Sequence, residues 1–218
     1  MRPAPQLVIM LKDPAPGRVK TRLGRDIGMV AAAWWFRHQV RALLREVTDP
    51  RWQVVLAVAP ARAALCSRAW PAHFSRIAQG PGDLGARMAR LMQGLPRGPV
   101  CIIGGDIPDL RKQHVARAFR ALGSNDAVFG PAMDGGFWLV GLKRVAPPPA
   151  GLFRDVRWSS EHALRDSIAS LGGARVALVD RLRDVDCAAD LMPPASAPAS
   201  GPASDPAARS AVCTAAQA

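Results

Sequence analysis

The chain has 218 residues, of which 49% are hydrophobic, and this is enough for a single domain with a sizeable core. Its four cysteines are scattered without a C-x-x-C pair, which argues against a disulfide framework and a zinc site. The early apolar run Leu7–Leu11 is closed by Lys12 and Asp13 and is too short for a secretory leader or a membrane span. We therefore expect a cytoplasmic protein without a membrane span.

The formal net charge of +12 raises the question of nucleic-acid binding. Residues 1–100 carry 16 Lys and Arg against 5 Asp and Glu, whereas residues 151–200 carry 6 against 7. The basic residues are mostly single arginines on helical stretches, without a dense run or interleaved aromatic residues. A basic surface that attracts phosphate-bearing small molecules fits the same charge, so nucleic acid is disfavoured as a partner.

The first half of the chain begins with a buried strand over Gln6–Leu11. A polar loop follows and extends to about Asp26. The next segment, Met29–Val47, is predicted to be a helix because its apolar residues recur at spacings of three and four and form one face. Strands are expected next over Gln53–Ala59 and, more briefly, over Phe74–Ile77.

The second half repeats the alternation and ends in a segment of different composition. Asp83 is expected to cap one helix, and Asp109 to cap another that ends near Leu122. The remaining elements are strands at Val100–Ile103, Ala127–Gly130, Phe137–Leu142 and Arg175–Val179 and a helix opened by Ser159 or Ser160 that ends near Leu171. From Pro193 to Ala218 the chain is rich in Ala, Pro and Ser, which predicts a disordered tail.

Strands that alternate with helices predict a three-layer α/β domain over residues 1–192, with a doubly wound and mostly parallel sheet. In such sheets, ligands bind beyond the carboxyl ends of the strands. This rule directs attention to the loops that follow Leu11, Ile103 and Val179.

The loop after the first strand carries four cations within eleven residues, namely Lys12, Arg18, Lys20 and Arg22. Pro14, Pro16 and Gly17 shape the backbone between them. Backbone N–H groups and side-chain cations of such a loop suit phosphate groups. The spacing matches neither a Walker A loop nor a dinucleotide-binding turn. A solvated basic loop is the plain alternative to a phosphate site.

Carboxylates follow the two other strands. Asp106 stands directly after Val100–Ile103, where it would reach a hard cation such as Mg²⁺ or Mn²⁺ that bridges to substrate phosphates. Capping of the next helix, the alternative role, is assigned to Asp109. After the last strand, Asp184 and Asp186 are separated by one residue. We expect only one of them, Asp186, to reach the centre of the site beside Asp106.

The segment Asp134-Gly135-Gly136 lies between two predicted strands. A hairpin turn is the simplest interpretation. Paired glycines would also let the backbone approach a ligand closely. Trp138 and Trp158 lie near the same cleft, and their roles stay open.

Taken together, these segments resemble a family of bacterial GT-A-fold proteins related to nucleotide-diphospho-sugar transferases and described as glycosyltransferases. The matching pieces are Lys12, residues 14–23, residues 82–88, residues 105–110, Gly130-Pro131, residues 134–139, Trp158-Ser159 and residues 183–186. They occur in the family's order and cover roughly residues 6 to 191. The chain departs from the pattern at Gly105, Ile107, Phe137-Trp138 and Ser160-Glu161, mainly on the acceptor side.

The resemblance implies a nucleotide or nucleotide-sugar, an unidentified small-molecule acceptor and a divalent metal, Mg²⁺ or Mn²⁺. The implied nucleotide- and phosphate-binding residues are Lys12, Gly17, Arg18, Lys20, Arg22, Asp83, Gly135 and Gly136. Asp106 and Asp186 are the implied metal ligands, and Asp106 and Asp134 the catalytic candidates, with Asp134 orienting or deprotonating the acceptor.

The closing Asp-x-Asp is similar to one in small guanylyltransferases of cofactor biosynthesis. Glycosyl transfer from a sugar nucleotide is therefore the main prediction, and nucleotidyl transfer from a triphosphate to a phosphorylated acceptor is the alternative. A catalytically silent nucleotide-binding module and a nucleic-acid binder are the rivals from other classes.

Overall fold

The computed structural model describes residues 4–191 and is organised around a seven-stranded sheet. The strands are β1 (Gln6–Lys12), β2 (Gln53–Ala59), β3 (Ser75–Ala78), β4 (Val100–Gly104), β5 (Ala127–Pro131), β6 (Phe137–Leu142) and β7 (Val176–Leu178). Their order is β3-β2-β1-β4-β6-β5-β7, and β6 runs antiparallel to both of its neighbours while the other pairs are parallel. The predicted mostly parallel α/β sheet is confirmed. The predicted tail lies outside the described residues.

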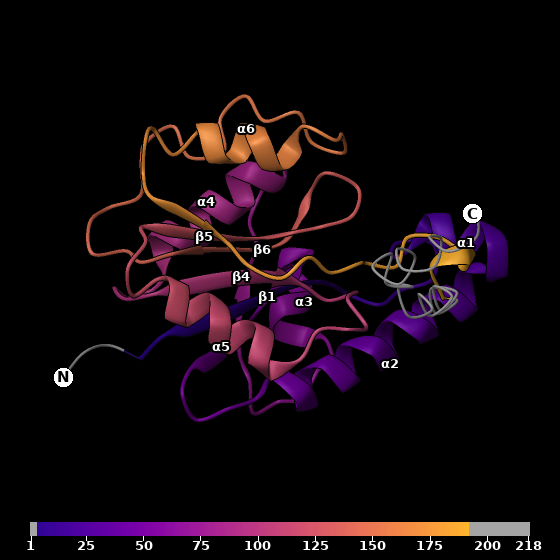
Figure 1. Ribbon diagram of the computed structural model, residues 1–218. Coiled ribbons are helices and arrows are strands. Elements are labelled where there is room, and N and C mark those ends of the chain that lie inside the picture. Colours follow the sequence, from indigo (N-terminus) through magenta and orange to yellow (C-terminus); the bar gives the residue numbers. More distant parts are fainter. Residues whose placement is uncertain (1–3, 192–218) are drawn as a thin grey trace, which may run out of the picture.

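Helices cover both faces of the sheet and make three layers (Figure 1). They are α1 (Thr21–Ile27), α2 (Met29–Val47), α3 (Ala61–Cys66), α4 (Leu84–Gly94), α5 (Lys112–Ala121), α6 (Ala163–Ala169) and the short 3₁₀ helix η1 (Ala188–Leu191). In Figure 1, α2 and α5 lie below the sheet, while α4 and α6 lie above it. None of the helices within residues 4–191 is long and apolar enough to cross a bilayer.

The central strands are continuous apolar runs because both of their faces are buried. In β1, Leu7, Ile9 and Leu11 are fully buried and belong to the core cluster that lies between the sheet and helices α2 and α5. Val8, between them, points to the opposite cluster, which includes residues of α4 and α6. Alternate residues of a strand face opposite sides, so one strand supplies both cores.

Some predicted element boundaries are wrong. The loop expected to extend to about Asp26 ends earlier, because residues 21–27 form α1, whose Leu23 is buried against α2 and Val185. Asp109 is exposed and does not cap α5, which begins at Lys112 with Arg111 as its N-cap. Likewise α6 begins at Ala163, and Ser160 Oγ accepts a hydrogen bond from the His162 N–H just before it at 3.2 Å. Tertiary packing sets these boundaries, and local pattern alone does not reveal them.

Asp83 is the N-cap of α4, as expected, and its Oδ1 accepts a hydrogen bond from the Ala86 N–H at 2.8 Å. Replacing Asp83 by Ala leaves that N–H without its partner. We expect a loss of about 1 kcal/mol in the free energy of unfolding, measured by urea denaturation. Asp83→Asn, which keeps an accepting oxygen, should lose little, and equal losses in both variants would contradict the capping role.

The sheet order changes direction between β1 and β4. From β1 the chain proceeds outward through β2 and β3, and it then returns to place β4 on the other side of β1. The carboxyl ends of these two neighbouring strands lie side by side, next to Lys12 and Gly104, and ligands of open α/β sheets bind beyond such strand ends at a change of direction. This point in the fold positions the candidate site.

Candidate functional site

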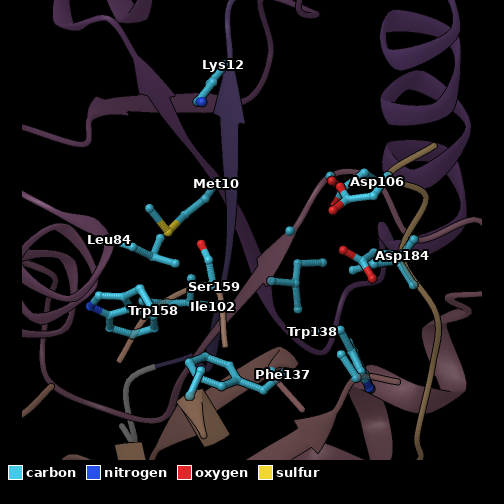
Figure 2. Close-up of a pocket in the computed structure, with 18 of the residues that line it drawn as sticks. Met10, Lys12, Leu84, Ile102, Asp106, Phe137, Trp138, Trp158, Ser159 and Asp184 are labelled. Carbon is cyan, nitrogen blue, oxygen red and sulfur yellow. The ribbon is translucent and has the colours of Figure 1, made fainter. Parts of the chain in front are cut away.

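A cavity of about 670 Å³ opens at the carboxyl ends of β1 and β4. One part of its wall is charged, with Lys12, Lys20, Arg22, Asp83, Arg87, Asp106, Asp134, Asp184 and Asp186. Another part is apolar, with Met10, Leu84, Met88, Phe137 and Trp158. Figure 2 shows Asp106 and Asp184 facing Met10, Leu84 and Trp158 across the cavity, with Phe137 at its lower end. The cavity thus offers one surface for charged groups and one for an apolar face.

Three carboxylates meet on the charged side. Asp106, Asp184 and Asp186 each offer an oxygen, and these oxygens all lie within 4.8 Å of one another. Asp106 follows β4 directly, whereas Asp184 and Asp186 come from the segment after β7. The Val185 N–H donates a hydrogen bond to the Asp106 carbonyl at 3.1 Å and holds this segment in place.

The expectation that only one of Asp184 and Asp186 reaches the centre is wrong. Residues two apart in an extended segment project to the same side, so both carboxylates face Asp106. Val185, between them, points the other way and is buried with Leu23 and Ala32. Burial, followed by the charges of Asp106, Asp186 and Asp134, raises the pKa of Asp184 above its ordinary value.

Lys20 reaches this cluster from the loop after β1. It is the residue before α1 and has a left-handed backbone, with φ 46° and ψ 47°. Its side chain is only 10% exposed, and its Nζ forms ion pairs with Asp106 and, at 3.2 Å, with Asp186. Burial acts to lower the pKa of Lys20, but Asp106 and Asp186 outweigh it and the pKa lies above its usual value. The amine is therefore charged at neutral pH.

The carboxylate cluster suits a hard divalent cation. Mg²⁺ and Mn²⁺ prefer carboxylate and water oxygens, and Mg²⁺ is commonly held by one or two carboxylates together with substrate phosphates. Three half-buried carboxylates from two strand ends provide such oxygens. The two predicted metal ligands, Asp106 and Asp186, lie together, and Asp184 joins them.

The cations of the first loop divide between two cavities. Lys12, Lys20 and Arg22 line the main cavity, and Arg22 donates a hydrogen bond to Asp186 at 2.9 Å. Arg18 instead lines a neighbouring cavity of about 650 Å³, to which Lys12 also contributes. Gly17 lines neither of them and allows a turn with φ +73°.

The Asp134 hairpin contributes to the site mainly through its first residue. Asp134 is exposed at the cavity wall, and its Oδ1 accepts a hydrogen bond from the Gly136 N–H at 2.9 Å. Gly136 also lines the cavity. Gly135 does not, and a Cβ there would lie 2.4 Å from the Cα of Glu161. Close packing of the backbone against Glu161 therefore explains why residue 135 is a glycine.

Sequence reasoning did not select Arg87, which lies on α4 and lines both cavities. Arg87 lies within the segment 82–88, which carries part of the family resemblance. That resemblance is the sequence signal by which Arg87 could have been identified as a site residue. Arg87 Nε donates a hydrogen bond to the Gly82 carbonyl at 2.9 Å, which orients it at the start of the helix. Lys12 and Arg87 together place positive charge where the two cavities meet.

The apolar wall depends on an unusual segment between β6 and α6. Phe153, Asp155 and Ser159 all have positive φ, between 58° and 62°. Trp158 packs with Phe137 and Phe153, with ring centroids 6.2 and 6.1 Å away. Backbone strain of this kind persists only where the surrounding structure fixes it, and it concentrates at functional sites. The segment thus holds Trp158 at the cavity.

The comparisons with known proteins agree with this architecture. Residues 43–160 match the family model DUF2064, described as "uncharacterized protein conserved in bacteria". A crystal structure from Desulfovibrio desulfuricans, described as a "putative nucleotide-diphospho-sugar transferase", is 30% identical, with a TM-score of 0.77 over 86% of this chain and 84% of that one. No match was found among curated proteins.

More distant solved structures share the fold. Rv0371c from Mycobacterium tuberculosis is 15% identical, with a TM-score of 0.54 over 88% of this chain and 96% of that one. The 4-diphosphocytidyl-2C-methyl-D-erythritol synthase from Anaerococcus prevotii is 8% identical, with a TM-score of 0.54 over 86% and 94%. At these identities the similarity shows a shared fold and nothing beyond it.

Proposed function

We propose that this chain, which belongs to the bacterial family DUF2064, transfers a glycosyl group from a nucleotide-diphosphate sugar to a small-molecule acceptor with the help of Mg²⁺ or Mn²⁺. The observation that carries the proposal is the composition of the main cavity. Three carboxylates from two strand ends, basic side chains and an apolar wall surround one space at the point where the sheet order changes direction.

The charged wall would bind the donor. Asp106, Asp184 and Asp186 would hold the metal ion, which supplies positive charge to the donor diphosphate. Lys12, Arg22 and Arg87 would contact the phosphates. Electrostatic stabilisation of the departing nucleoside diphosphate by such fixed cations lowers the barrier to transfer.

The neighbouring cavity would extend the donor site. Lys12 and Arg87 line both cavities, so a molecule whose phosphates lie at these cations can reach into each of them. A donor of this kind has two ends, a nucleoside and a sugar, joined by the diphosphate. The second cavity would therefore hold the nucleoside, with Arg18 at its wall, and the main cavity would hold the sugar.

The acceptor would bind in the main cavity beside Asp134, whose charge also acts on Asp184 of the carboxylate cluster. Asp134 is exposed there at the tip of the β5–β6 hairpin and would orient or deprotonate the acceptor hydroxyl. Phe137 and Trp158 would contact an apolar face of the sugar or the acceptor.

Cytoplasmic location is part of the proposal. Cys66, Cys101 and Cys187 are free thiols, as expected in a reducing compartment.

Nucleotidyl transfer is a second candidate, favoured by the number of cations. Lys12, Arg18, Arg62 and Arg87 all line the second cavity. That much positive charge, added to Lys20 and Arg22 in the main cavity, suits a triphosphate as well as a diphosphate. The reaction would then join a nucleoside monophosphate to a phosphorylated acceptor and release pyrophosphate.

Binding and product analysis separate the candidates. Nucleotide sugars and nucleoside triphosphates are first screened for a rise in Tm, each with and without MnCl₂, because a ligand that binds the native state stabilises it. We expect the largest rise with a nucleotide sugar and Mn²⁺, and release of a nucleoside diphosphate upon addition of acceptors. Pyrophosphate release would instead support nucleotidyl transfer. Salt-sensitive DNA or RNA binding without a response to nucleotides would contradict both.

A further inference from the structure

Lys20 lies where a cation belongs. Its Nζ forms ion pairs with both Asp106 and Asp186, two of the three carboxylates whose oxygens lie within 4.8 Å of one another. An ammonium is a compact point charge, so it compensates these carboxylates much as a small metal ion would. Lys20 is the residue directly before α1 and has a left-handed backbone conformation, so its main chain is fixed at the start of this helix.

The other cation at the cluster is held much less firmly. Arg22 reaches Asp186 at 2.9 Å, but its side chain is 69% exposed, and solvent screens such a pair strongly. The Lys20 side chain is 10% exposed and contacts two carboxylates from different strand ends. Among residues 4–191, Lys20 is therefore the principal counter-ion of the cluster.

A divalent ion and this ammonium bind to the same oxygens. Like charges at close range in a half-buried site repel strongly. Two cations therefore do not share Asp106 and Asp186 at the short distances that Lys20 adopts. One has to move away before the other is bound.

We propose that Lys20 is a resident counter-ion that the divalent ion displaces, so that the metal binds in competition with the Lys20 ammonium. The inference rests on the metal site of the proposed function. It also gives Lys20 two positions. Without metal, the ammonium stabilises the carboxylates. With metal, it is released while still tethered at the start of α1, beside the cavity that Lys12 and Arg22 also line.

Release links the metal to the donor. The displaced ammonium is one more cation for the donor phosphates, and it becomes available only after the metal has bound. Metal binding would therefore raise the affinity for a diphosphate through Lys20, in addition to direct contacts between metal and phosphate. Such coupling is a property of two ligands that favour the same state of the protein.

The test uses Mn²⁺ alone, titrated into the full chain and followed by calorimetry and by the electron paramagnetic resonance signal of unbound Mn²⁺. Lys20→Met removes the competing charge and keeps an apolar stem of similar length. We expect it to bind Mn²⁺ at least about tenfold more tightly than the wild type, an effect of the size that groups next to metal ligands have on affinity. Lys20→Arg keeps the charge and should stay close to the wild type.

Lys12→Met is the matched control, because Lys12 lines the same cavity but forms no ion pair within residues 4–191. Its Mn²⁺ affinity should not rise. Thermal unfolding gives a second readout: metal-free Lys20→Met should melt below the wild type, and Mn²⁺ should raise its Tm by more. If Lys20→Met does not fold, Lys20→Gln provides a second neutral replacement.

The outcomes separate the inference from the proposed function. Equal or weaker Mn²⁺ binding by Lys20→Met, in a protein whose wild type binds Mn²⁺, would overturn the competition and leave the metal site standing. Absence of Mn²⁺ binding in both the wild type and Lys20→Met would overturn the metal site and the competition together.

Discussion

Replacing Asp106 by Asn should remove metal-dependent nucleotide binding. Asp106 pairs with Lys20, as Asp186 also does, and the Asp106 backbone carbonyl anchors the segment carrying Asp184 and Asp186. Asn keeps the size and the backbone but loses the negative charge that attracts a hard cation. We expect Mn²⁺ affinity to fall by about 100-fold or more, the upper end of what changes around a metal site produce. Isothermal titration with Mn²⁺, then with a nucleotide sugar, measures both effects.

Asp109→Asn is the matched control for this experiment. Asp109 lies three residues further along the same segment, is exposed and does not line the main cavity. Its replacement removes the same charge from the chain without touching the cluster. Mn²⁺ affinity should remain at the wild-type level. A similar loss in both variants would mean that the total charge of the segment controls binding, and the assignment of Asp106 as a ligand would be wrong.

Replacing Gly135 by Ala should destabilise the fold and deform the apolar side of the cavity. The new Cβ would lie 2.4 Å from the Glu161 Cα and 2.5 Å from its carbonyl oxygen, which are backbone atoms. Gly135 also has φ +86°, which an alanine adopts only with strain. We expect a loss of about 2 to 4 kcal/mol, combining about 1 for the strained backbone with 1–3 for the overlap.

Thermal unfolding measures this loss as a fall in Tm of roughly 5 to 15 °C for a chain of this length. Gly151→Ala is its control, because Gly151 has no positive φ and nothing lies within 4 Å of its added Cβ. That variant should melt close to the wild type. If Gly135→Ala were equally harmless, Glu161 would have to move easily, and the segment that carries Trp158 would be far less fixed than its contacts imply.

Strong local patterns made much of the fold predictable. The helix Met29–Val47 and the strand Gln53–Ala59 match their predicted bounds. The helix has apolar residues at helical spacing along its whole length, and the strand is a continuous apolar run after its first residue. By contrast, α1 has few apolar residues, and its buried Leu23 is stabilised by α2 and by Val185, which is far away in sequence. A short helix held by such distant contacts leaves little local signal.

The candidate site was predictable where residues follow a strand directly. Asp106 is such a residue, because a carboxylate at the end of a buried strand has a defined direction. Both carboxylates of the later pair could also have been expected, since residues two apart share a side. Arg87 was harder, because its place depends on how α4 packs on the sheet. The residues with positive φ around Trp158 are not glycines, so the sequence does not predict the left-handed backbone of that segment.

The position in the chain of the residues proposed to face the acceptor has a consequence for how the family diversifies. Asp134, Phe137 and Trp158 all come from one continuous stretch between β5 and α6, whereas Lys12, Lys20 and Asp106 precede it. Exchange of that stretch between relatives would replace the residues proposed to face the acceptor in a single recombination event. The residues proposed to bind phosphate and metal before residue 107, and the pair Asp184 and Asp186, would be inherited unchanged. Relatives that differ in this stretch would thus accept different acceptors and use the same donor.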